Sequence, residues 1–255
     1  MSTPPSPRRL AATGYGRPMK QGEDGGSEPH VFDTADGHYM VKVRNNPQGL
    51  RVLTNELVGG LCLDWLRVNH PESAVIMIDQ ALIDLSPEAK FRNGQKLEHG
   101  EAFGSKYWQS DPSGTVSVNL IENKADAAGT LALDTWLPPS DSRQYRLRAS
   151  KEAPGRYDYF PVDQGHQFGN PNWTANDLAS KQNAIATPAA VVPMTADDLA
   201  LSIVRLRAFS DEIAAHMVGE IPGGWLENDL RRALQKYLVA RAGPVADAIE
   251  KRFKK

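Results

Sequence analysis

The spacing of hydrophobic and polar positions changes along this chain, from short strand-like runs to helical periodicity. Runs with strand-like composition at 30–33 and 38–43 flank Ala35-Asp36-Gly37, and Asp-Gly between two such runs is typical of a β-hairpin. Over residues 50–66, large apolar side chains recur every four positions, which predicts a helix. Residues 74–85 form a nearly continuous apolar run, which predicts a buried strand at the connection between two lobes.

The last third of the chain favours helices. Thr195, with Asp198 three positions later, resembles a capping box, and an apolar face with helical spacing follows it. A Pro-Gly-Gly sequence at 222–224 breaks this face. Two more helices are predicted over 225–242 and 244–253, because the Gly-Pro pair between them is typical of one helix ending and the next beginning. The patterns predict an α+β fold, rich in strands first and rich in helices afterwards.

Composition and charge exclude several classes of protein. The 255 residues include 29 basic and 31 acidic ones, and a net charge of −2 gives no reason to expect nucleic-acid or anionic-membrane binding. No apolar run approaches the ~20 residues that span a bilayer. Residues 1–12 lack the hydrophobic core of a signal peptide and are rich in Pro, Ser and Arg, so we expect a flexible tail and a cytoplasmic protein. Because Cys62 is the only cysteine, an intrachain disulfide and a cysteine-rich zinc site are excluded.

Two acidic residues follow the elements predicted in the middle of the chain. The apolar run 131–137 predicts a helix that a proline pair ends, so Asp141 lies in the loop behind it. The aromatic, strand-like run 157–162 leads Asp163 into a turn at Gly165. A carboxylate at a strand end before glycine can point a metal ligand into a cleft, and a second carboxylate can handle a proton. The alternative is that both are surface aspartates that cap turns.

Three further features of the first third of the chain have open interpretations. Lys42 lies between two valines of the predicted strand at 38–43, where it is either a solvent-facing or a functional lysine. Glu56 lies beside the apolar stripe of the helix at 50–66, from where it can reach Lys42. The loop 21–29 contains three glycines and can expose N–H groups to a phosphate, or it can be an ordinary hairpin loop.

The order of these features resembles that of protein-kinase-like folds: a glycine loop, a lysine on a strand, a glutamate on the next helix, and two later aspartates. Several segments resemble more specifically the HipA-like kinases, in the shorter branch that lacks a separate N-terminal subdomain. These segments, within about 14–240, are 25–29, 39–43, 48–49, 55–60, 103–107, 162–165 and 221–226.

The resemblance implies a bilobal protein-kinase-like fold, with a small β-rich N-lobe at 13–80 that binds nucleotide and a larger helical C-lobe at 81–255. It also implies ATP and Mg²⁺ as cofactors and an unknown protein as substrate, phosphorylated on Ser or Thr. By resemblance, Gly25, Gly26 and Ser27 would contact the phosphates, and Lys42, held by Glu56, would bind the α- and β-phosphates. Met77 to Asp79 would lie near the adenine hinge. Asp141 would be the catalytic base and Asp163 a magnesium ligand.

One departure from the family concerns the metal ligands. Arg146 stands where the family has asparagine, five residues after the aspartate, and Ser142 stands where a basic residue follows it. A guanidinium cannot coordinate a cation, and its charge repels a second Mg²⁺, so we expect one metal ion. Arg146 can instead contact phosphate oxygens, and Gln144 can supply a carbonyl if the loop is shifted.

Three functions therefore remain open at the level of sequence. The first is an active kinase that acts on a protein, as a toxin or in a stress response. The second is a kinase-like pseudoenzyme that binds nucleotide or a partner without phosphate transfer. The third is an α+β interaction domain in which the order of the motifs is coincidental.

Overall fold

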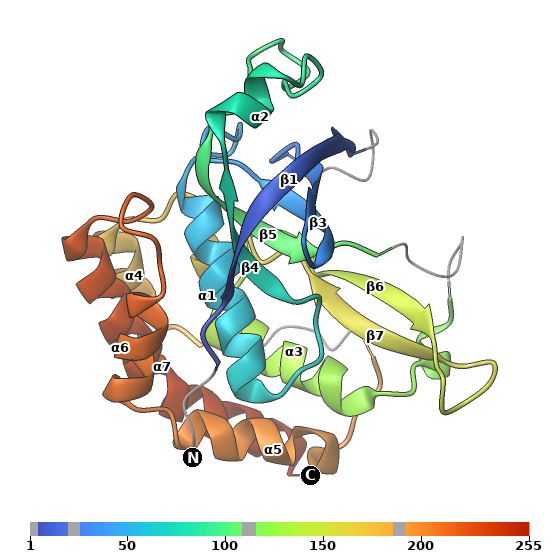
Figure 1. Ribbon diagram of the computed structural model, residues 1–255. Helices are drawn as coiled ribbons and strands as arrows, with labels where there is room; N and C mark the ends of the chain where they lie inside the picture. Colours follow the sequence, from blue (N-terminus) through green and yellow to red (C-terminus); the bar gives the residue numbers. More distant parts are fainter. Residues whose placement is uncertain (1–4, 20–25, 109–115, 186–191, 255) are drawn as a thin grey trace.

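The computed structural model describes residues 5–19, 26–108, 116–185 and 192–254, and it has two unequal parts (Figure 1). The smaller part is a closed barrel with the strand order β1-β2-β3-β5-β4. Its strands are β1 (Arg8–Pro18), β2 (His30–Thr34), β3 (Gly37–Lys42), β4 (Ser73–Ile78) and β5 (Gly100–Lys106). The larger part is mainly helical. The predicted order, a β-rich region followed by a helical region, is confirmed.

Strands β2 and β3 form the predicted hairpin, in which His30–Thr34 pair with Gly37–Val41. Gly37 turns the chain with a φ of +101°, a conformation that glycine adopts without the steric cost met by other residues. Phe32, Tyr39 and Val41 point into the barrel and are fully buried there. Because successive side chains of a strand point to opposite faces, Lys42 points to the other side of β3, toward the rest of the molecule.

Helix α1 (Arg51–Leu66) contacts both the barrel strands β4 and β5 and the C-terminal helices. Every residue from 52 to 63 is buried, so the helix is enclosed on all sides and its polar residues are enclosed with it. A Cβ on Gly59 would stand 2.6 Å from the Cβ of Gln164, which shows how closely a distant turn approaches the helix. Glycine at this position permits that approach.

Helix α3 (Lys124–Trp136) is central in the larger part. Helices α5 (Ala196–Arg207) and α7 (Asn228–Phe253) pack directly against it, while α4 (Ala175–Lys181) and α6 (Asp211–Gly219) pack against α7. The hairpin of β6 (Gln144–Ala149) and β7 (Tyr157–Val162) buries Leu147 and Tyr159 against the α3 side. Its opposite face, with Gln144 and Arg146, is therefore turned away from α3.

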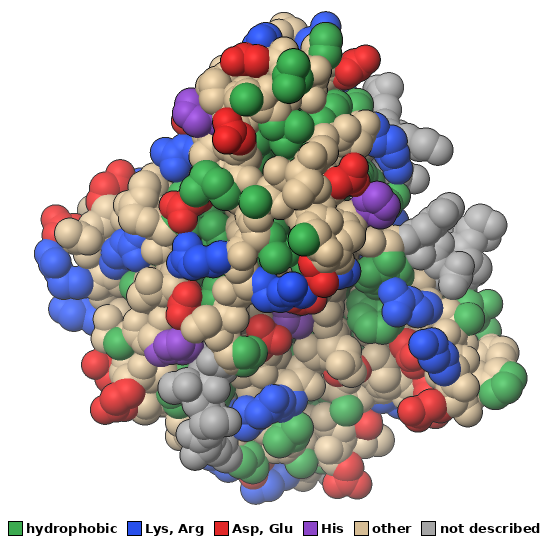
Figure 2. Space-filling view, viewed as in Figure 1, with side chains coloured by type: hydrophobic (Ala, Val, Ile, Leu, Met, Phe, Trp, Pro, Cys, Tyr) green, Lys and Arg blue, Asp and Glu red, His purple; other side chains and the backbone are tan. Residues whose placement is uncertain are grey.

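Charged side chains of both signs are interspersed over the face shown in Figure 2. This mixture agrees with the small net charge of −2. Within the part of the chain that the structure describes, no helix is both long enough and apolar enough to cross a bilayer.

The N-terminal boundaries differ from the prediction. Strand β1 begins at Arg8, so residues 8–12 belong to the sheet and not to a flexible tail. This stretch pairs in parallel with β4 and closes the barrel, and its arginines reach carboxylates, with Arg8 2.6 Å from Asp36. Strand β5 also lies beyond the predicted N-lobe boundary at residue 80. Pairing between segments far apart in sequence sets both boundaries.

Two predicted elements end at other residues than expected. The apolar run 74–85 is a strand only to Ile78, because Asp79 accepts a hydrogen bond of 2.9 Å from the Ala81 N–H and caps helix α2 (Gln80–Asp84). Helix α7 runs on through Pro244, where two helices were predicted. A proline inside a helix costs about 3 kcal/mol. Complete burial of the neighbouring Val245 and Ala246 offsets that cost.

The barrel contains a histidine that should make stability depend on pH. His30 is 1% exposed, and burial lowers its pKa to about 4, whereas it is about 6.5 in an unfolded chain. Between these values the unfolded state binds more protons, so stability is lost as the pH falls from about 6.5 toward 4, by up to about 3 kcal/mol. Urea unfolding at several pH values should show this slope, and His30→Asn should flatten it.

Candidate active site

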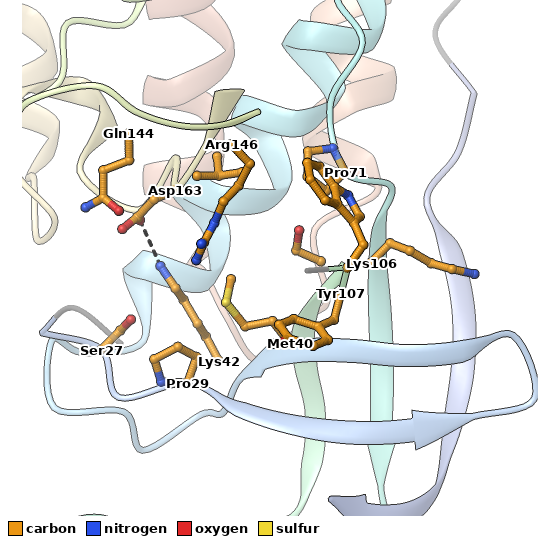
Figure 3. A pocket seen from close by; sticks show the side chains of 13 residues that line it. Ser27, Pro29, Met40, Lys42, Pro71, Lys106, Tyr107, Gln144, Arg146 and Asp163 are labelled. Atoms are coloured by element: carbon orange, nitrogen blue, oxygen red, sulfur yellow. Dashed lines mark hydrogen bonds and ion pairs between the residues drawn. The ribbon is translucent and has the colours of Figure 1, made fainter. Parts of the chain in front are cut away.

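A pocket opens between the barrel and the β6–β7 hairpin (Figure 3). Strands β3 and β5 with the segment after β5 form one wall, and β6 and the end of β7 form the other. Residues of both polar and apolar character line it. They are Ser27, Pro29, Met40, Lys42, Pro71, Ser105, Lys106, Tyr107, Trp108, Gln144, Arg146, Val162 and Asp163.

Lys42 joins three separate elements at the inner end of this pocket. Its Nζ donates one hydrogen bond to Glu56 Oε1 on α1 and another, of 2.9 Å, to Asp163 Oδ1 after β7. The second oxygen of Glu56 accepts a bond of 2.8 Å from the Gln164 N–H. The predicted ion pair of Lys42 and Glu56 is confirmed, and Asp163 belongs to the same cluster.

The charges of this cluster are tightly coupled because one ammonium lies between two carboxylates. Burial alone would lower the pKa of Lys42, but Asp163 and Glu56 outweigh it and raise that pKa, so the lysine is charged. Burial raises the pKa of Glu56 above its ordinary value. Burial also opposes the ionisation of Asp163, but Lys42 more than offsets it and lowers the Asp163 pKa. Asp163 is therefore the firmly ionised carboxylate that faces the pocket.

The backbone at Asp163 has an unusual conformation. Asp163 has a φ of +58°, in the left-handed region that residues other than glycine seldom adopt and that aspartate tolerates better than most. Its neighbour Gly165 lies close to α1, since a Cβ there would stand 3.0 Å from Val52 Cγ1 and 3.2 Å from Glu56 Oε1. The turn is thus pressed against the helix that supplies Glu56. Strained conformations of this kind occur most often at functional sites.

Arg143 contacts this turn from the side of α3. The sequence patterns did not identify this residue. Its guanidinium forms a buried ion pair with Asp134 of α3 and donates to the Val162 carbonyl at 3.2 Å and to Gln164 Oε1 at 2.7 Å. The signal in the sequence was Asp134 itself, an acidic residue inside the apolar helical run 131–137. A carboxylate in such a run needs a buried cationic partner.

Asp141 lies where the prediction expects it, in an exposed loop after α3. A small depression beside the pocket brings it together with Gln144, Asp163 and His166. Its Oδ1 accepts a hydrogen bond of 2.7 Å from the Ser142 N–H. The two aspartates of the sequence prediction therefore meet at one site, although 22 positions separate them in the sequence.

The glycine loop is described only in part. Gly25 lies outside the described residues. Gly26 lies against Gln48, whose Nε2 would stand 2.6 Å from a Cβ at this position. Ser27 is 3% exposed and lines the pocket across from Asp163, so the end of the loop does reach the site (Figure 3).

Met77 and Asp79, predicted near the adenine hinge, do not line this pocket. Met77 pairs with Glu101 at the start of β5, whereas Lys106 at its other end reaches the pocket. Five residues of extended strand separate Glu101 from Lys106, about 17 Å at ~3.4 Å per residue. Met77 is half exposed and Asp79 caps α2. At the end of β5 that reaches the pocket, Tyr107 and Trp108 form the wall.

The side chains at the pocket fit a magnesium ion that arrives with a phosphate ligand. No group of three or more His, Cys, Asp and Glu side chains suited to a metal occurs in the described ranges. Asp163 and the amide oxygen of Gln144 lie on the same side of the pocket (Figure 3). Mg²⁺ is commonly bound by one or two protein oxygens together with substrate phosphates and waters, so this small donor set is sufficient.

The β-rich part and the helical part together form a protein-kinase-like fold, which the match to one solved structure supports. The crystal structure of the Helicobacter pylori proinflammatory kinase CtkA matches with a TM-score of 0.58 and 12% identity, over 95% of this chain and 94% of that one. The Golgi casein kinase with Mn/ADP bound matches with a TM-score of 0.47 and 10% identity, over 98% of this chain and 75% of that one. No family model and no curated protein sequence matches the chain. The likeness to CtkA therefore concerns the fold.

The support beneath the Asp163 turn should be measurable as stability. Arg143→Ala leaves Asp134, whose side chain is 8% exposed, without its cation, so the free energy of unfolding should fall by about 3–5 kcal/mol. The exposed pair of Arg232 and Asp229 is the control, and Arg232→Ala should cost less than about 1 kcal/mol. Urea denaturation of both variants tests this. Equal losses would contradict a structural role for the buried pair.

Proposed function

We propose that this protein is an ATP- and Mg²⁺-dependent phosphotransferase with protein-kinase chemistry. The observation that carries the proposal is the enclosed cluster of Lys42, Glu56 and Asp163 beside a pocket between a β-rich part and a helical part. Protein kinases use a strand lysine, a helix glutamate and an aspartate before a glycine in the same order. The fold supports the proposal because it is kinase-like.

Each residue of the site has a physical role in this proposal. Lys42, held by Glu56, binds the α- and β-phosphates, and Ser27 closes the pocket above them. Asp163 and Gln144 hold Mg²⁺, which neutralises charge on the phosphates when it is bound. Asp141 lies exposed in the adjoining depression, where its carboxylate orients the acceptor hydroxyl and accepts its proton. Phosphate transfer depends mainly on such positioning and charge compensation.

The narrower proposal is a HipA-like kinase that phosphorylates a serine or threonine of another protein, as a toxin or in a stress response. It is supported by the segments 39–43, 55–60, 162–165 and 221–226, which resemble that family. The first three of these segments contain Lys42, Glu56 and Asp163. The exposed position of Asp141 suits an acceptor hydroxyl on a macromolecule. The chain's own charges do not identify the substrate protein.

A pseudoenzyme that binds nucleotide without transferring phosphate is the second candidate. Arg146 and Ser142 favour it, because they stand at two positions where the family has asparagine and a basic residue. The two candidates differ only in the chemical step, so binding and transfer have to be measured separately.

Nucleotide binding should depend on Lys42. Lys42→Met should abolish the rise in melting temperature that ATP with Mg²⁺ causes, while the protein stays folded because Glu56, with its raised pKa, can take up a proton. Lys96→Met, which changes an exposed lysine of the β-rich part, should keep the full shift. Thermal melts with and without nucleotide measure both. An unchanged shift in Lys42→Met would remove this lysine from the site.

Transfer should depend on both aspartates. The wild-type protein is incubated with γ-labelled ATP and Mg²⁺, alone and with lysate proteins, and label on protein is counted. Asp141→Ala should lose transfer but keep nucleotide binding, since it removes the proton acceptor only. Asp163→Asn should lose transfer and the magnesium dependence of binding. Binding without transfer in the wild-type protein would favour the pseudoenzyme.

A further inference from the structure

The cations of the pocket differ in whether the protein neutralises them. Lys42 and Lys106 each have a carboxylate in ion-pair contact. Arg146 lines the same pocket, yet among the residues that the structure describes no carboxylate lies within 4.0 Å of its guanidinium. A half-buried guanidinium is always protonated, so its charge is left for a ligand to compensate.

The position of Arg146 directs this charge into the pocket. It stands on β6 opposite Phe160, on the strand face turned away from α3. Figure 3 shows its side chain extending into the cavity from the wall that also holds Gln144, with Lys42 and Met40 on the facing wall. A ligand between the two walls would meet the guanidinium on one side and Lys42 on the other.

The charges at the inner end of the pocket show why a second cation matters. Lys42 supplies one positive charge against the two carboxylates of Glu56 and Asp163. A polyphosphate would therefore meet an excess of negative charge there, even with the lysine in place. With Arg146 included, the formal charges of these four side chains add up to zero. Its planar group also offers paired donors that match phosphate oxygens.

We infer that Arg146 binds the polyphosphate of a nucleoside triphosphate and supplies the positive charge that a second metal ion would otherwise provide. The identity of the ligand as a nucleotide rests on the proposed function. The anion-binding role of the arginine rests on the pocket itself and is testable with inorganic tripolyphosphate.

Arg148 is a matched control for this inference. It lies two residues further along β6, on the same face, and has the same charge. Its guanidinium is 4.2 Å from the centroid of the Trp108 ring and 5.4 Å from that of Phe160, and the residue does not line the pocket. Removing its charge changes the net charge of the protein as much as removing that of Arg146, but it removes no side chain that lines the pocket.

The experiment compares three variants with the wild-type protein by titration calorimetry, using tripolyphosphate, ATP with Mg²⁺, and adenosine. Arg146→Met should weaken tripolyphosphate and ATP binding about 10- to 100-fold, as expected for lost hydrogen bonds to a charged group, and should leave adenosine binding unchanged. Arg146→Lys should recover part of the loss. Arg148→Met should change each affinity less than about threefold, because its charge lies outside the pocket.

The outcomes separate this inference from the proposed function. Unchanged tripolyphosphate and ATP binding in Arg146→Met would overturn the inference while leaving a kinase that works through Lys42. An equal loss of adenosine binding, or no binding of tripolyphosphate by the wild-type protein, would overturn it as well. Tripolyphosphate binding that depends on Arg146 in a protein that neither binds ATP nor transfers phosphate would support the inference and remove the proposed function.

Discussion

The two parts of the molecule are joined by charge at the buried ammonium group of Lys42. It is 2% exposed, and an isolated charge buried to that degree is strongly unfavourable. Glu56 and Asp163 compensate it from α1 and from the turn after β7, so three distant segments of the chain must meet at one nitrogen. Removing either carboxylate, or moving its element, leaves charge uncompensated in the interior. Two of these three groups, Lys42 and Asp163, also line the pocket.

The backbone around this nitrogen adapts to the close approach. Gly59 and Gly165 let α1 and the turn come nearer than side chains would permit, and Asp163 takes up a left-handed conformation between them. Arg143 holds the carbonyl side of the same turn against α3. Conformational strain at Asp163 is therefore maintained by contacts on both sides, which is the condition under which strain persists in a folded protein.

Sequence patterns predict the parts of this site that follow from local order. Lys42 and Glu56 could be paired in advance because they lie on a predicted strand and the next predicted helix, and because the resemblance to kinases pairs them. Asp163 could be identified because it ends a strand before glycine. The hydrophobic pattern did not show that the strand within the run 74–85 ends at Ile78, where Asp79 caps helix α2.

Long-range contacts account for the other differences between sequence prediction and structure. Strand β1 begins at Arg8 because residues 8–11 pair with β4, more than sixty positions away. The role of Arg143 depends on Asp134 and on a turn twenty residues further on, so no local pattern contains it. Helix α7 continues through Pro244 because its neighbours are buried in the core. In each case tertiary contacts outweigh the local signal.

The β6 strand also explains how Gln144 and Arg146 can share the pocket. In a loop, Gln144 would take the place of the metal ligand only if the loop were shifted away from the alignment that puts Arg146 there. In an extended strand, residues two positions apart point to the same side, and both line the cavity. A neutral amide oxygen near Asp163 and a guanidinium further along can then act together, the first suited to a cation and the second to an anion. Because these residues form a strand and not a loop, both Gln144 and Arg146 face the pocket, one with a neutral oxygen and the other with a positive charge.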